Sequence, residues 1–330
     1  MTHGQFPYIR GRRLRTSAAM RDMVAEHNLK PADFIAPVFV MEGENEKVEI
    51  PSMPDYYRYT LDLLMNELQE LKDVGIRSVL VFAKVPDELK DNKGTEALNP
   101  DGLMQRAVRT IKEEFPQMLV MTDIAMDPYS SYGHDGIVED GKILNDESVQ
   151  VLSKMAVSHA EAGVDMVAPS DMMDGRIGKM REALDGEGFE HTGIMAYSAK
   201  YASSYYGPFR DALDSAPGFG DKKTYQMDPA NVQEAIKEAK LDEQEGADIV
   251  MVKPGLPYMD VIRAVKESVS VPVSVYNVSG EYAMLKAAAE KGWLNEEEAM
   301  MEALVGFKRA GADLIATYFA KAASKILLEQ

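Results

Sequence analysis

The feature that most constrains the fold of this chain is a regular alternation of short apolar segments with amphipathic helical patterns. Eight segments of strand length, rich in Val, Ile, Tyr and Phe, cover residues 33–40, 78–84, 118–127, 165–171, 193–200, 248–254, 271–280 and 313–320. Helical patterns separate most of them, and three of these patterns end at a glycine suited to a helix C-terminus: Gly75, Gly163 and Gly246. Strands that alternate with helices pair in parallel, and eight of them favour a closed (β/α)8 TIM barrel over an open doubly wound sheet.

The first 32 residues lie outside this alternation. They contain Arg10, Arg12, Arg13 and Arg15, whereas the whole chain carries a net charge of −18. Arginine is favoured at protein interfaces, so an arm that docks on a neighbouring subunit explains this segment better than a nucleic-acid binder does. A frayed, solvated terminus remains the alternative. We therefore expect an extended N-terminal arm at residues 1–32 and a catalytic barrel at residues 33–330.

Charge and cysteine content exclude several classes of function. A net charge of −18 repels nucleic acid and anionic membranes, so we expect neither as a partner. No stretch approaches the roughly 20 apolar residues of a membrane span, and the N-terminal residues lack the apolar region of a secretory signal. The chain has no cysteine, which excludes disulfides and thiolate metal sites and suits a reducing compartment.

Two lysines define the candidate catalytic centre. In a barrel of this type the carboxyl ends of the strands form the active-site face. Lys200 ends the segment 193–200, and Lys253 stands near the end of the segment 248–254. A single lysine at a strand end is most often a solvated residue. Two on neighbouring strands point into one mouth, where like charge and an apolar wall disfavour the ammonium form. A neutral lysine amine attacks a ketone to form a Schiff base.

Other polar side chains collect at the same strand ends: Asp123, Asp127, Ser170, Asp171, Ser198, Tyr276, Ser279 and Tyr318. The segment that follows Lys200 adds cations and an amide in a stretch punctuated by Gly and Pro: Arg210, Lys222, Lys223 and Gln226. Basic residues on a loop over the mouth predict capture of a small carboxylate, which arginine binds with two parallel hydrogen bonds. A charged surface loop explains the same residues equally well.

Five motifs in order along the chain resemble one enzyme family. They are "APSDMMDGR", "YSAKYASSYYGPFRDA", "IVMVKPG", "YNVSGEYAM" and "KRAGADLIATYFA". Together with the "RGRRLR" arm they resemble the 5-aminolevulinate dehydratase (porphobilinogen synthase) family over nearly the whole chain. The resemblance implies a (β/α)8 lyase, assembled as a homo-octamer through its arm, that condenses two molecules of 5-aminolevulinate to porphobilinogen with loss of two waters. This reaction serves haem and chlorophyll synthesis, so we expect a cytoplasmic protein, or a plastid stromal one in a photosynthetic eukaryote.

The resemblance also assigns roles to residues of this chain. Lys253 would form a Schiff base with the substrate that supplies the propionate side, and Lys200 would bind the substrate on the acetate side. Ser279 and Tyr318 match the residues that hold a carboxylate at the first position. The other carboxylate would be bound by Arg210, Lys222 and Gln226, although family members often carry arginine where Lys222 stands. Polar residues of the second pocket correspond to Ser170 and Asp123, and the aromatic walls, or core residues, to Tyr197, Phe209 and Tyr276.

The resemblance separates this chain from the zinc-dependent members of the family. The three cysteines of those members correspond here to Ala125, Asp127 and Asp135. No thiolate remains for zinc, so we expect no catalytic zinc, and carboxylate oxygens suit Mg²⁺. The pattern resembles the zinc-independent, magnesium-stimulated type, in which Glu238 would hold an allosteric Mg²⁺ largely through waters. Asp127 and Asp135 either bind an ion or are hydrogen-bonding residues of an active-site loop.

Two other functions compete with this interpretation. A class I aldolase also forms a Schiff base in a TIM barrel, but it needs one lysine rather than the pair Lys200 and Lys253. A barrel that only binds a ligand or a partner is the second rival. Burying two ammonium groups without a use is costly, which disfavours that rival.

Overall fold

The computed structural model describes residues 6–213, 218 and 220–329. The first five residues of the expected arm lie outside the described residues, as do the last residue of the barrel and part of the loop between Arg210 and Lys222. Within the described residues, no helix combines the length and apolarity needed to cross a membrane.

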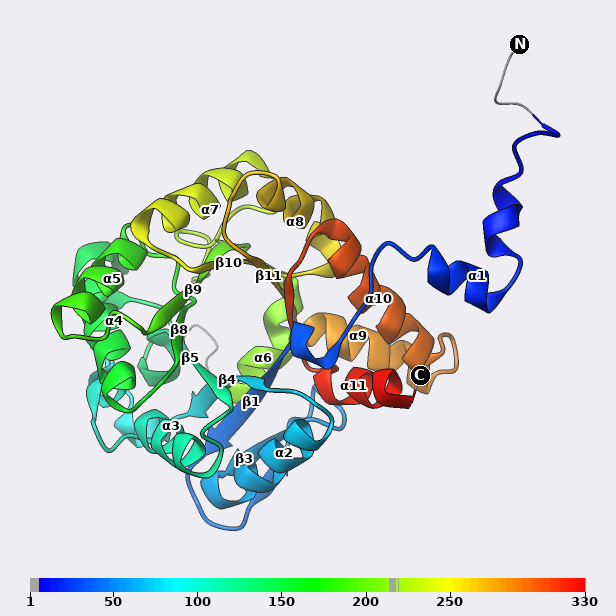
Figure 1. The fold of residues 1–330 in the computed structure, drawn as a ribbon. Helices are drawn as coiled ribbons and strands as arrows, with labels where there is room; N and C mark the ends of the chain where they lie inside the picture. Colours follow the sequence, from blue (N-terminus) through cyan, green and yellow to red (C-terminus); the bar gives the residue numbers. More distant parts are fainter. Residues whose placement is uncertain (1–5, 214–217, 219, 330) are drawn as a thin grey trace.

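Eight parallel strands close into a barrel, as predicted (Figure 1). They are β1 (Phe34–Met41), β4 (Ser78–Lys84), β5 (Leu119–Ile124), β8 (Met166–Pro169), β9 (Gly193–Lys200), β10 (Ile249–Lys253), β11 (Val273–Asn277) and β12 (Leu314–Thr317). Each strand pairs with the next in this order, and β12 pairs back to β1, with Ile315 opposite Phe34. All eight strands coincide with the apolar segments predicted from the sequence, because buried parallel strands need nearly continuous apolar runs.

Helices form an outer ring around the strands (Figure 1). They are α2 (Leu61–Asp73), α3 (Leu103–Glu114), α4 (Asn145–Glu161), α5 (Arg176–Gly186), α7 (Gln233–Glu245), α8 (Met259–Lys266), α9 (Ser279–Glu290), α10 (Glu296–Ala310) and α11 (Ala320–Glu329). The predicted glycine ends of three helices are confirmed: Gly75, Gly163 and Gly246 have φ of 85°, 98° and 105°, a conformation that side-chain-bearing residues rarely adopt.

Smaller elements decorate the barrel. An exposed strand β2 (Lys47–Glu49) and β3 (Tyr57–Thr60) extend the sheet beside β1, and β6 (Ile137–Glu139) pairs with β7 (Lys142–Leu144) as a separate hairpin. The short helix α6 (Gly207–Leu213) follows β9 and contacts α9 and β4 across the barrel end. These insertions lie between a strand and its following helix, where (β/α)8 barrels build their sites.

The N-terminal segment projects away from the barrel (Figure 1). It contains a 3₁₀ turn (Gly11–Arg15) and α1 (Ala18–Met23), and neither element has a buried residue. Phe6, Tyr8 and Ile9 are between 60% and 81% exposed. A segment that leaves such apolar side chains exposed buries little surface on its own chain.

The closure of the barrel generates a stability prediction. Ile315 is fully buried at the pairing of β12 with β1. We expect Ile315→Ala to lower the free energy of unfolding by about 2–5 kcal/mol, because it removes packed methyl groups and leaves a cavity. Chemical denaturation followed by circular dichroism measures the change. Leu328→Ala, at a position 60% exposed, is the control and should stay within about 0.5 kcal/mol of the parent chain. Equal effects of the two substitutions would contradict this account.

Candidate active site

The two predicted lysines stand side by side at the carboxyl ends of adjacent strands. Lys200 is the last residue of β9, Lys253 is the last residue of β10, and they are register partners in the sheet. Only 6% of Lys200 and 5% of Lys253 is exposed. The expected pairing of two buried amines in one mouth is therefore present.

Aromatic rings surround the amine of Lys253. Its Nζ lies 5.0 Å from the ring centre of Tyr197, 5.0 Å from that of Phe209 and 4.7 Å from that of Tyr276. Burial, and after it the positive charge of Lys200, lower the pKa of Lys253 to about 7, against the opposing effect of nearby aspartates. The amine is thus held near the point where a large share of it is neutral and nucleophilic at physiological pH.

Lys200 sits in a more polar part of the same mouth. Its Nζ donates a hydrogen bond to the backbone oxygen of Ser170, the residue that follows β8. The Ser170 side chain bonds to Asp123 at the end of β5. Burial, and after it the negative charge of Asp127, raise the pKa of Asp123 to about 7. A carboxyl group in this range can accept or donate a proton beside the two lysines.

Unpartnered polar atoms mark the space that a substrate would contact. Asp123 Oδ1 and Tyr197 Oη are buried and have no hydrogen-bond partner within the described residues. Leaving such groups unpaired costs free energy. Both belong to the mouth that contains Lys253, so a polar ligand entering there gains hydrogen bonds that the protein alone does not make.

Lys222 occupies the position between the two aspartates considered as metal ligands. Its Nζ donates to Asp127 Oδ2 and to Asp135 Oδ2, both at 3.1 Å, and all three side chains are buried. Burial disfavours the charged form of Asp135 and so acts to raise its pKa. The positive charges of Lys222 and Lys200 outweigh this effect and hold the pKa of Asp135 below its usual range. The donor set does not fit a metal ion, because an ammonium already sits between the oxygens and no cluster of three His, Cys, Asp or Glu ligands exists among the described residues. The sequence did not reveal this ion-paired arrangement.

Ser279 and Tyr318 lie on the other side of the mouth. Ser279 begins α9, is fully buried and accepts a hydrogen bond from the backbone N–H of Phe209 at 2.9 Å. The hydroxyl of Tyr318 lies 3.0 Å from that of Tyr276, one of the rings around Lys253. Both hydroxyls thus contact residues whose rings, those of Phe209 and Tyr276, surround the amine of Lys253, and hydroxyl donors at this place suit a substrate carboxylate.

The remaining predicted residues are dispersed. Arg210 lies half-buried on α6, and Gln226 is buried beyond the loop. Gln226 and Glu238 line a common cavity of about 770 Å³, together with His134 and Met173 from the segments after β5 and β8. Glu238, on α7, is half-buried, and burial raises its pKa, as does the charge of Asp242. The structure thus brings Gln226 nearer to the remote carboxylate than the sequence suggested.

Tyr206 is an additional residue of the mouth that the sequence analysis did not select. Its ring lies 5.1 Å from the Nζ of Lys253, and its hydroxyl donates to the backbone oxygen of the same lysine at 3.2 Å. The aromatic run in "SSYYGPF" (203–209) carries the only sequence signal for it. That run does not show which ring turns toward β10.

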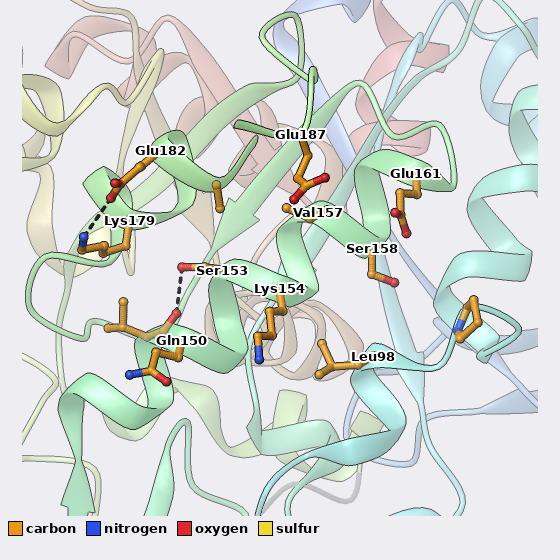
Figure 2. A pocket seen from close by; sticks show the side chains of 13 residues that line it. Leu98, Gln150, Ser153, Lys154, Val157, Ser158, Glu161, Lys179, Glu182 and Glu187 are labelled. Carbon is orange, nitrogen blue, oxygen red and sulfur yellow. Dashed lines mark hydrogen bonds and ion pairs between the residues drawn. The ribbon is translucent and has the colours of Figure 1, made fainter. Parts of the chain in front are cut away.

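A second cavity, of about 680 Å³, lies far from the lysines on the outer wall between α4 and α5 (Figure 2). Its floor includes Val157, and its rim carries Lys179 and Glu182, which pair with each other at 2.8 Å. None of the residues predicted for catalysis or substrate binding lines it. The chemistry of this chain is therefore to be sought in the barrel mouth.

Comparison with known proteins gives one consistent result. The family model for delta-aminolevulinic acid dehydratase matches residues 8–326. The chain is 56% identical to the chloroplastic enzyme of that name from Chlamydomonas reinhardtii, across 96% of this chain and 84% of the relative. It is 55% identical to the Bacillus subtilis enzyme of that name, across 97% of this chain and 98% of the relative.

A solved structure gives the same answer at the level of the fold. The delta-aminolevulinic acid dehydratase (porphobilinogen synthase) of Toxoplasma gondii, in complex with the reaction product porphobilinogen, superimposes with a TM-score of 0.96 at 53% identity. The match covers 97% of this chain and 92% of that one. Similarity in sequence and fold thus extends over arm, barrel and mouth, and the chain belongs to the delta-aminolevulinic acid dehydratase family.

Proposed function

We propose that this chain is a porphobilinogen synthase, a lyase of tetrapyrrole biosynthesis that condenses two molecules of 5-aminolevulinate to porphobilinogen and releases two waters. Family membership supports this reaction, as does the Toxoplasma gondii relative in complex with porphobilinogen. The observation that carries the proposal is the buried pair Lys200 and Lys253 on adjacent strands.

Lys253 is the first nucleophile in this scheme. Its neutral amine attacks the ketone of one substrate and expels water to form a Schiff base, whose iminium carbon is more electrophilic than the ketone. The aromatic rings around Nζ bury the amine, and this burial lowers its pKa to about 7, so a large share of the amine is neutral before attack. Ser279 and Tyr318 bind the carboxylate of that substrate.

Lys200 binds the second substrate in the same way. Asp123 and Ser170 flank it, and a carboxyl whose pKa is about 7 is suited to remove a proton next to the imine carbon. The resulting enamine attacks the neighbouring substrate. Holding both molecules in one mouth replaces a bimolecular encounter with a local reaction.

The second carboxylate is bound by Arg210, Lys222 and Gln226 in this scheme. Lys222 would then give up part of its ion pairing with Asp127 and Asp135 to bind the substrate.

A class I aldolase is the alternative. It would use Lys253 alone, so Lys200 would be replaceable. The coupling of the two lysines in one buried mouth favours the two-substrate reaction.

Borohydride trapping tests the lysine chemistry. We expect 5-aminolevulinate followed by borohydride to label Lys253, with a rate that rises as the pH passes through about 7, because the neutral amine is the nucleophile. Lys200→Met removes a like charge, so the pKa of Lys253 should rise and the profile should move to higher pH. Peptide mass spectrometry measures the adduct.

Lys84→Met is the matched control, since Lys84 also ends a barrel strand but lies four strands from β10. Its profile should match that of the parent chain. No adduct on either Lys200 or Lys253, or unchanged porphobilinogen formation by Lys200→Met, would contradict the proposed reaction; the second result would favour an aldolase-type use of one lysine.

We also propose that Mg²⁺ is the metal of this enzyme and that it acts from outside the mouth. Glu238 fits a hydrated ion: its half-buried carboxylate lines an open cavity together with Glu234 and the amide of Asn145. Mg²⁺ keeps most of its waters and needs few protein ligands. The ion would favour the charged form of Glu238, whose pKa is raised by burial and by Asp242. No catalytic zinc is expected.

Metal removal tests this assignment. We expect EDTA to lower porphobilinogen formation and Mg²⁺, not Zn²⁺, to restore it. Glu238→Gln should abolish the stimulation and leave the unstimulated rate near that of the EDTA-treated parent. Glu234→Gln, one turn earlier in the same cavity, should retain most of the response. Restoration by Zn²⁺ alone, or full stimulation of Glu238→Gln, would refute the proposal.

The N-terminal segment, residues 1–32, is proposed as the arm that assembles a homo-octamer. Its exposed Phe6, Tyr8 and Ile9, next to a run of arginines, have the composition of an interface. We expect a chain that starts at residue 31 to form smaller assemblies than the full chain in sedimentation velocity. An unchanged number of subunits would contradict the role of the arm.

The names and organisms of the relatives indicate the cellular compartment only in broad terms. The Chlamydomonas reinhardtii relative is named a chloroplastic enzyme, and the Bacillus subtilis relative belongs to a bacterium. We propose a cytoplasmic location, or the plastid stroma if the source is a photosynthetic eukaryote.

A further inference from the structure

One buried carboxylate outside the set already described ties together the strand ends that carry the catalytic groups. Glu281 lies in the first turn of α9, two residues after Ser279, and only 1% of it is exposed. It is more than 20 residues from Lys253 in sequence, yet its oxygens reach the loop that follows that lysine. No positive side chain pairs with it among the hydrogen bonds and ion pairs described; its partners are backbone N–H groups and an amide.

Both oxygens of this carboxylate bind the loop after β10. Glu281 Oε1 accepts a hydrogen bond from the backbone N–H of Leu256, and Oε2 accepts one from Gly255 at 3.3 Å. These residues come two and three positions after Lys253, separated from it by Pro254. A buried carboxylate that receives two adjacent N–H groups fixes the course of that loop.

The same carboxylate binds the loop after β11. Oε2 also accepts from the backbone N–H of Val278 at 2.5 Å, directly before Ser279. The side chain of Asn277 adds a hydrogen bond, and its Oδ1 in turn accepts from Thr317 Oγ1 at 2.9 Å. Thr317 is the last residue of β12 and precedes Tyr318. Glu281 therefore binds the segments after β10 and β11 directly and is linked to the end of β12 through Asn277.

Close packing keeps this junction rigid. A side chain at Gly280 would come within 2.5 Å of the backbone oxygen of Tyr205, so the first turn of α9 lies directly against the segment that leads into α6. Ser279 accepts from the N–H of Phe209 in α6. Glu281 thus stands between the β10 loop on one side and the beginning of α6 on the other.

We infer that Glu281 is a positioning residue for the proposed reaction: it sets the separation between the amine of Lys253 and the hydroxyls of Ser279 and Tyr318. A substrate bound through a Schiff base and a carboxylate has only two CH₂ groups between these ends, so both ends are satisfied only over a narrow range of separations. Glu281 touches neither end; it acts through the backbone on both. A carboxylate that is buried without a cationic partner costs desolvation free energy, and this positioning role explains why Glu281 is buried nevertheless.

Glu281→Gln is the decisive substitution. The amide has the same shape, but its NH₂ group must face one of the three backbone N–H donors, so one hydrogen bond is replaced by a repulsive contact. We expect kcat for porphobilinogen formation to fall by about 10- to 100-fold, with a smaller change in KM, because a misplacement of about 1 Å is enough for such a loss. Borohydride trapping of substrate at Lys253 should slow as well. A purely structural role would lower the melting temperature and leave kcat unchanged well below the transition.

Asp248→Asn is the matched control at the opposite end of the same strand. Asp248 precedes β10, and its Oδ2 accepts from the backbone N–H of Ile194 at 2.8 Å. The chemical change is the same, from carboxylate to amide, but the affected backbone lies away from the mouth. We expect kcat within about twofold of the parent chain, in line with a surface substitution. Equal losses of kcat in the two variants, or an unchanged kcat in Glu281→Gln, would overturn the inference.

Thr317→Val provides an independent measurement if Glu281→Gln does not fold. It removes the hydroxyl that orients Asn277 and keeps the branched shape of a strand residue. A fall in kcat of about fivefold, the value of one hydrogen bond, supports the inference, and an unchanged kcat overturns it. The inference rests on the proposed function. Borohydride trapping with the keto acid 4-oxopentanoate distinguishes a failure of the inference from a failure of the proposed function. If the parent chain formed no porphobilinogen, trapping of this keto acid at Lys253 would still show whether Glu281→Gln misplaces the amine.

Discussion

The site depends on the burial of two amines at the ends of adjacent strands. Water would stabilise both as ammonium ions, but only 6% of Lys200 and 5% of Lys253 is exposed, so desolvation and mutual repulsion act together. The aspartates of the mouth oppose this effect and favour the charged form of Lys253. The closed barrel makes this burial possible, because it holds Lys200 at the end of β9 and Lys253 at the end of β10 as register partners in one mouth.

In the mouth, charged side chains of the chain itself balance one another. Lys222 lies between Asp127 and Asp135 and donates a hydrogen bond to each, so a buried lysine of the chain itself supplies the cation that balances these two carboxylates. Glu281 is stabilised in a different way: backbone N–H groups donate hydrogen bonds to its carboxylate, and no ion is needed. The same centre thus combines a charge that can be exchanged with a carboxylate whose hydrogen bonds fix the scaffold.

Local patterns made most of the fold and its two central lysines predictable. Buried parallel strands require apolar runs, and a lysine directly after such a run is conspicuous, so β9, β10, Lys200 and Lys253 followed from the sequence. The pairing of Lys222 with Asp127 did not, since these residues are 95 positions apart and either one is compatible with solvent. Tyr206 and Glu281 were missed for a related reason: only the packing of α6 and α9 decides which member of an aromatic run, or which helical carboxylate, faces inward.

The short strand β2 has a consequence beyond the site. Closure of the barrel leaves β2 as the outer edge of its sheet, and unpaired strand edges are templates for aggregation. This edge is three residues long, and a lysine and a glutamate flank its single valine. Another chain therefore finds too few backbone partners at β2 to extend the sheet at this edge.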